Sequence, residues 1–136
     1  MDVTVRSSTR QGLSEFLEDQ DYLVESLSPH ILAVKSVGGP TVYIAQQHHE
    51  EGIGRLYFEL SLGLLGNLEQ NAPVLFKLLD LNSEITPVSV AVNSEDGQPR
   101  LCLVESLESG NLDNNEVLSV LEAMGLACLR VQQLLD

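Results

Sequence analysis

The sequence predicts an α+β fold in which a single antiparallel sheet is packed by helices. Two observations lead to this class. The predicted helices do not alternate with strands, as they would in a parallel α/β sheet, and the strand-like runs follow one another through short turns. The predicted order is helix, antiparallel strands, helix, β-hairpin, helix. The 136 residues contain no linker, low-complexity tract or internal repeat, so we expect a single domain over residues 1–136.

The first predicted element is a short helix. Leu13, Phe16 and Leu17 recur at i, i+3 and i+4, which places them on one helical face. Ser8 followed by Gln11 resembles a capping box at its start. A helix this short has to pack against other elements to persist.

Four strand-like runs follow, separated by turn residues. They are Tyr22–Leu27, Ile31–Val37, Thr41–Gln46 and Arg55–Leu62. Gly38-Gly39-Pro40 is a strong turn signal between the second and third runs. The fourth run alternates most clearly, with apolar side chains at Leu56, Phe58, Leu60 and Leu62. This alternation predicts a sheet with one face against the core and the other face in water.

The middle helix is more apolar than a single buried face requires. Asn71 is a candidate N-cap, and Pro73 suits the first helical turn. The apolar residues that follow are Val74, Leu75, Leu78, Leu79 and Leu81. Such a helix is either deeply buried or packed on two sides, and the sequence leaves both interpretations open.

A hairpin and a long helix complete the predicted fold. Val88–Val92 and Arg100–Leu107 are strand-like, and Glu95-Asp96-Gly97-Gln98 between them contains the Asp-Gly turn signal. Asp113 and Glu116 form a capping-box pattern. The helix after them carries one apolar stripe at Val117, Val120, Leu121, Met124, Cys128, Val131 and Leu135. Three further leucines lie outside this stripe: Leu126 about opposite to it, and Leu118 and Leu129 beside it. Incidental surface positions are the favoured interpretation of these three leucines, and a binding patch is the alternative.

The charge of the chain argues against several functions. Twenty acidic side chains against seven basic ones give a net charge of −13 at pH 7. An acidic surface repels phosphate, which disfavours nucleic acids and anionic membranes as partners. The N-terminus lacks the pattern of a signal peptide, and no apolar run approaches the roughly 18 residues that span a bilayer. We therefore expect a soluble cytoplasmic protein without membrane insertion.

Residues of the kind that bind metals gather in one place, His48-His49-Glu50-Glu51. Zn²⁺ binds imidazole and carboxylate groups, but adjacent residues cannot easily converge on one ion. A solvated loop is the favoured interpretation, and a small metal-binding protein or enzyme is the alternative. Cys102 and Cys128 stand in apolar surroundings, which predicts buried, unreactive thiols. We expect no cofactor, no metal, no catalytic residue and no enzymatic activity.

The second half of the chain carries a resemblance to known proteins. Leu78-Leu79-Asp80-Leu81-Asn82 ends the middle helix, and Val131-Gln132-Gln133-Leu134-Leu135 ends the last one, with the hairpin between them. This arrangement resembles the C-terminal half of type III secretion chaperones and of their relatives, the YbjN-domain proteins. The polar loop His48–Gly54 and an additional strand favour the YbjN side.

The resemblance implies the secretion chaperone-like fold and a homodimer without enzymatic activity. It also implies that the middle helix contributes to the dimer contact and that apolar patches bind a segment of a partner protein. We therefore expect a chaperone-like protein-interaction module, or, as a weaker alternative, a structural subunit of a larger assembly. The candidate contacts with a second copy or a partner are Val74, Leu75, Leu78, Leu79, Leu118, Leu126 and Leu129.

Overall fold

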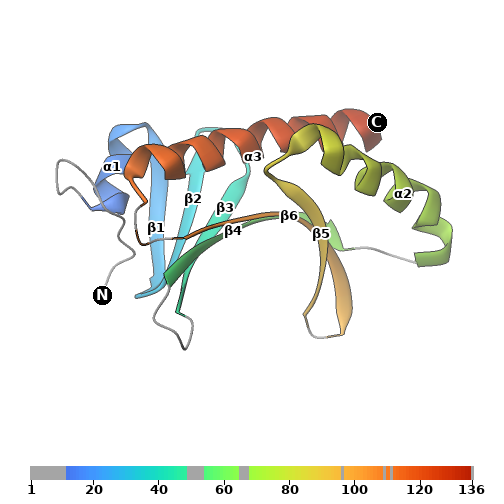
Figure 1. Cartoon of the computed structure of the whole chain (residues 1–136), viewed down its shortest axis with the longest axis horizontal. Helices are drawn as coiled ribbons and strands as arrows, with labels where there is room; N and C mark the ends of the chain where they lie inside the picture. The colour runs from blue at the N-terminus through green and yellow to red at the C-terminus, as the bar shows by residue number, and fades with distance from the viewer. Residues whose placement is uncertain are drawn as a thin grey trace.

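The computed structural model describes residues 12–48, 54–64, 68–95, 97–108, 110 and 112–135. Within them the elements follow in the predicted order, and the α+β prediction is confirmed. The elements are α1 (Leu13–Asp19), β1 (Tyr22–Ser28), β2 (Ile31–Ser36), β3 (Thr41–His48), β4 (Gly54–Leu64), α2 (Leu68–Ile85), β5 (Ser89–Glu95), β6 (Gln98–Glu108) and α3 (Asn114–Leu135). Figure 1 shows the three helices on the same side of one curved sheet.

The six strands form one antiparallel sheet in the order β1-β2-β3-β4-β6-β5, so β1 and β5 are its edges. The hairpin enters the sheet through β6, which pairs with β4 from Arg55↔Glu108 to Leu64↔Arg100. The register of this pair shifts between Ser61 and Gly63. Gly63 has a φ of 118°, a conformation that glycine adopts without strain. Such an irregularity bends a strand, and Figure 1 shows the β5–β6 hairpin turning away from the rest of the sheet.

The core lies between the sheet and the helices, as the alternation in β4 predicts. Leu56, Phe58 and Leu60 are buried, whereas Tyr57 and Glu59 between them are only partly covered. On the helical side of the core, α1 contributes two buried leucines, Leu13 and Leu17. The largest helical contribution comes from α3, whose buried residues are Asn114, Val117, Val120, Leu121, Met124, Ala127, Cys128 and Val131. The predicted stripe of α3 is therefore confirmed up to Val131.

The predicted cap of α3 is present. The backbone N–H of Glu116 donates to Asp113 Oδ1 at 3.0 Å, which satisfies one of the free N–H groups of the first turn. At α1 the residue before the helix is Gly12, which makes no side-chain capping bond. The Ser8 and Gln11 pattern lies outside the described residues.

Two sequence predictions about helix ends are wrong. The middle helix begins at Leu68, before the predicted cap Asn71, so Pro73 lies inside it. Proline is tolerated near a helix start because the first N–H groups have no intrahelical acceptor, which makes it a poor marker of the first residue. Leu135 was predicted on the buried stripe but is half exposed. Figure 1 shows the last turns of α3 near α2, past the meander of β1 to β4.

By length and mean hydropathy, α3 could also cross a membrane; it is the one helix in the described ranges that passes this test. Its most apolar face is the one that supplies the core. At its C-terminal end it is joined to α2 by an exposed ion pair, in which Arg130 Nη2 lies 3.3 Å from Glu84 Oε1. Exposed pairs of this kind contribute little to stability. Packing against the core, rather than this pair, therefore positions α3.

Candidate protein-binding surfaces

Helix α2 has two apolar faces. Leu78, Leu81 and Ile85 face the core and are buried. A second row, which we call the α2 stripe, consists of Ala72, Leu75, Phe76 and Leu79, at the i, i+3, i+4 and i+7 positions of a helical face. Phe76 is 75% exposed and Leu79 is 56% exposed. The described part of the chain therefore leaves Phe76 and Leu79 of the second face uncovered, while Leu75 packs partly against the core.

The sequence placed four candidate contact residues on this helix, and the structure separates them. Leu79 is exposed, whereas Leu75 is half-buried and packs against the core from one side of the α2 stripe. Val74 is 37% exposed, although its helical angle is that of the core face. Leu78 is 1% exposed and belongs to the core. Sequence reasoning missed Phe76. A helical wheel identifies it, because Phe76 and Leu78 are about 200° apart at 3.6 residues per turn.

A second surface is a groove beside α3, which we call the α3 groove, with a volume of about 780 Å³. One wall is the turn between β2 and β3, and the other is a flank of α3. The described residues that line the groove are Ser36, Gly38, Gly39, Pro40, Glu122, Gly125, Leu126, Cys128, Leu129 and Gln132. Leu126 and Leu129, two of the predicted contacts, are 66% and 55% exposed on its rim. Leu118, the third, is half-buried one turn before the groove.

A third surface runs along the edge of the sheet. Among the described strands, β1 pairs with β2 alone, so the outer side of β1 presents unpaired backbone groups. Beside this edge lies a groove of about 430 Å³, formed mainly by the face of the sheet away from the helices and bordered by Glu18 of α1. We call it the β1 groove. Its apolar and aromatic lining consists of Tyr22, Leu23, Val24, Leu27, Ala33 and Tyr43, with Glu18, Glu25 and Lys35 around them. Sequence analysis did not single out these residues.

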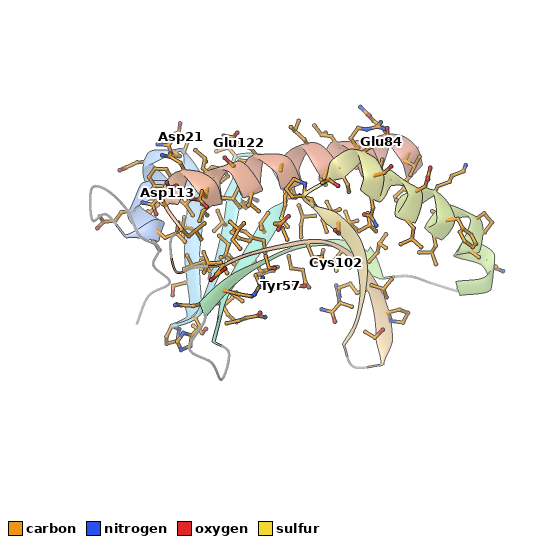
Figure 2. The ribbon with its side chains drawn as sticks, viewed as in Figure 1. Asp21, Tyr57, Glu84, Cys102, Asp113 and Glu122 are labelled. Atoms are coloured by element: carbon orange, nitrogen blue, oxygen red, sulfur yellow. The ribbon has the colours of Figure 1, made fainter. Side chains whose placement is uncertain are left out.

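A polar cluster occupies the same face further along the sheet. Glu59 Oε1 accepts a hydrogen bond from Tyr57 Oη at 2.8 Å and another from Asn93 Nδ2 at 3.2 Å. Figure 2 shows Tyr57 and Cys102 at the sheet, whereas Glu122 projects from α3 on the helical side. The bond from Asn93 thus links β5 to Glu59 of β4 across the strand between them, β6.

Both cysteines are buried and form no disulfide, as their apolar surroundings predicted. Burial, and after it the nearby Glu59 carboxylate, raises the pKa of the Cys102 thiol from 9.0 to about 11. Burial also raises the pKa of Cys128. Because the thiolate is the reactive form, neither thiol is activated as a nucleophile at neutral pH.

The candidate metal ligands fall mostly outside the described residues. The backbone of His48 pairs with that of Gly54 at the end of β3, and His49, Glu50 and Glu51 lie in an undescribed segment. Within the described ranges, no group of three or more His, Cys, Asp or Glu side chains could hold a metal ion. The metal-binding alternative is therefore not tested by this geometry.

The sequence matches no protein-family model and no curated protein. Its fold is similar to that of a chain in the heterodimeric complex ExoU-SpcU from the type III secretion system of Pseudomonas aeruginosa, with a TM-score of 0.65 and 22% sequence identity. The similarity covers 89% of this chain and 95% of that chain. At this identity the likeness is one of fold, and the predicted secretion chaperone-like fold is confirmed. The relation to YbjN-domain proteins stays a prediction.

Proposed function

We propose that the chain is a non-enzymatic, cytoplasmic protein-interaction domain that forms a homodimer and binds a segment of a partner protein. The observation that supports this function best is the α2 stripe. A helix that already supplies core residues carries a second apolar row with Phe76 at its centre. Burial of apolar area is favourable by roughly 25 cal/mol per Å², so such a row favours contact with another surface.

In the proposed dimer, α2 packs against α2 of a second copy across a two-fold axis. A two-fold contact places the same residues on both sides, and a row of four apolar side chains around Phe76 is self-complementary in this way. The charge of the chain opposes this contact. A net charge of −13 repels a second copy at long range, so dimer contact requires a patch in which apolar burial outweighs this repulsion.

The partner-binding surface we propose is the β1 groove. An extended segment can hydrogen-bond to the free edge of β1, while its alternate side chains enter the groove between Leu23, Leu27 and Tyr43. Pairing with β1 is regular from Tyr22 to Ser26, before the register shifts towards Ser28. A partner strand of about five residues therefore fits this edge. The similar fold was itself found in a heterodimeric complex, which supports a protein as the partner.

Cross-linking tests the proposed dimer geometry. Two copies of a Phe76→Cys variant are expected to form an intermolecular disulfide under mild oxidation, because the two α2 helices meet at this position. The native thiols are buried and do not interfere. A Val37→Cys variant is the matched control, since Val37 is exposed in the β2–β3 turn away from α2. Equal cross-linking of the two variants would contradict the α2 contact.

Strand addition at β1 has its own test. A ten-residue peptide of alternating leucine and threonine with two terminal lysines should protect backbone amides of β1 from hydrogen exchange. The same peptide methylated at every second backbone nitrogen cannot pair with the edge, so it should give no protection. If both peptides protect β1 equally, or neither does, strand addition at this edge is wrong.

A further inference from the structure

We propose that the α3 groove is a docking site for an amphipathic helix of another protein, which carries a lysine or arginine opposite Glu122. The inference builds on the proposed function in one respect only, that the chain binds other proteins. The α3 groove shares no described lining residue with the α2 stripe or the β1 groove.

The first argument is the glycine in the wall of the groove. Gly125 lies in the middle of α3, where glycine lowers helix stability relative to alanine by about 1 kcal/mol. A Cβ added at this position would meet no atom within 4 Å, so the packing of the chain itself does not require glycine. The open space lies on the groove side, and a missing side chain there allows another backbone to approach closely.

The second argument concerns backbone hydrogen bonds and selects a helix over an extended segment. The groove runs along the turn between β2 and β3, where the Gly39 N–H already donates to the Ser36 carbonyl at 2.9 Å, and both free edges of the sheet, β1 and β5, lie elsewhere. The middle of α3 uses its backbone groups within the helix. An extended segment in the groove would therefore have no strand edge to pair with, whereas a helix satisfies its own backbone groups.

The third argument is chemical complementarity. The exposed side chains of Leu126 and Leu129 form an apolar rim, and Glu122 is the one charged residue among the ten described residues that line the groove. An apolar face with a neighbouring cation matches this pattern, and an acidic face would be repelled by a chain of net charge −13. Lys35 and Glu122 both line a smaller adjoining hollow of about 120 Å³. Glu122 also lines the α3 groove, whereas Lys35 does not, so Glu122 is the charge that a helix in the groove would meet.

The size of the site defines the probe. The flank from Glu122 to Gln132 extends for about 15 Å at 1.5 Å per residue, which corresponds to three turns of a partner helix. We would use a fluorescent 14-residue helical peptide with one leucine face and two lysines beside it. Three control peptides replace the lysines by glutamates, the leucines by glutamines, or a central residue by proline.

Amide shifts in NMR spectra of the full chain locate the peptide, and fluorescence anisotropy gives its affinity. We expect the lysine peptide to shift residues 36–40 and 122–132, and the glutamate and proline peptides to bind at least tenfold more weakly. Gly125→Leu should weaken binding at least tenfold by filling the wall, and its thermal unfolding will show that it folds. Glu122→Lys should reverse the preference between the lysine and glutamate peptides.

Several results would overturn the proposal. These are an absence of binding, shifts confined to α2 or β1, an unchanged charge preference in Glu122→Lys, or equal binding of the proline peptide. Shifts confined to α2 or β1 would reject the α3 groove and leave the proposed function standing. Conversely, binding in the α3 groove by a chain that is monomeric and does not pair at β1 would reject the proposed homodimer and the proposed β1 surface and leave this inference standing.

Discussion

Phe76 and Leu78 stand two positions apart on α2 and face opposite environments. Phe76 is 75% exposed, and Leu78 is 1% exposed within the core. Because consecutive helical residues turn by about 100°, two positions place them on nearly opposite sides of the helix. Leu78 therefore packs in the core, whereas Phe76 belongs to the α2 stripe.

This opposition predicts different responses to the same kind of truncation. Leu78→Ala should lower the free energy of unfolding by about 2–5 kcal/mol, because it removes core contacts and leaves a cavity. Phe76→Ala should change the stability of the monomer by less than about 0.5 kcal/mol, since Phe76 is mostly in water. Urea unfolding at sub-micromolar concentration measures both. Equal destabilisation by the two variants would contradict the assignment of the two faces.

Two glycines should respond oppositely to alanine. Gly125→Ala should stabilise the chain by about 0.5–1 kcal/mol, because alanine favours helix and its Cβ meets no atom within 4 Å. Gly63→Ala should destabilise the chain, because Gly63 holds a φ of 118° that alanine adopts only with strain. Thermal unfolding compares both variants with the wild type. A loss of stability in Gly125→Ala would show that the space beside α3 is smaller than described.

The elements that the sequence predicted well are those with a clear period. The alternation in β4 and the stripe of α3 up to Val131 each follow from one repeated contact with the core. The start of α2 was not predictable from Pro73, because proline is compatible with several positions near a helix start. Phe76 was overlooked because an apolar residue in a leucine-rich run resembles core until its angle on the helix is considered.

Removal of the cap of α3 should cost a measurable amount of stability. Asp113→Ala leaves the N–H of Glu116 without its side-chain acceptor, and we expect a loss of about 0.5–2 kcal/mol. Asp113→Asn retains an acceptor oxygen and should lose less. Chemical denaturation of the three proteins decides this prediction. Identical midpoints for the alanine variant and the wild type would show that the capping bond contributes nothing.

The raised pKa of Cys102 predicts a loss of stability in alkaline solution. The folded state holds the thiol proton up to a pKa of about 11, whereas the unfolded state releases it near 9.0. The folded state therefore binds more protons between these values, and the stability from this group is present below pH 9 and declines from pH 9 to 11. Urea unfolding from pH 7.5 to 10.5 should show a shallower decline in Cys102→Ala. Parallel profiles for the two proteins would contradict the prediction.

The candidate surfaces were less predictable than the fold. The β1 groove combines residues from α1 and three strands, including Leu23, Ala33 and Tyr43, which come together only through the register of the sheet. The α3 groove likewise depends on a turn and a helix that are more than 80 residues apart in the chain. Leu126 and Leu129 could be identified beforehand, because their helical angle alone separates them from the buried stripe.

Sedimentation equilibrium over a dilution series tests the central claim, a homodimer through the α2 stripe, most directly. Wild type at tens of micromolar should have twice the mass of one chain, and a Phe76→Ser variant should sediment as a folded monomer. Val37→Ser removes an apolar side chain that is even more exposed than Phe76 but lies away from α2, so this variant should remain dimeric. A monomeric wild type, or a Phe76→Ser variant that dimerises as strongly as the wild type, would contradict the account.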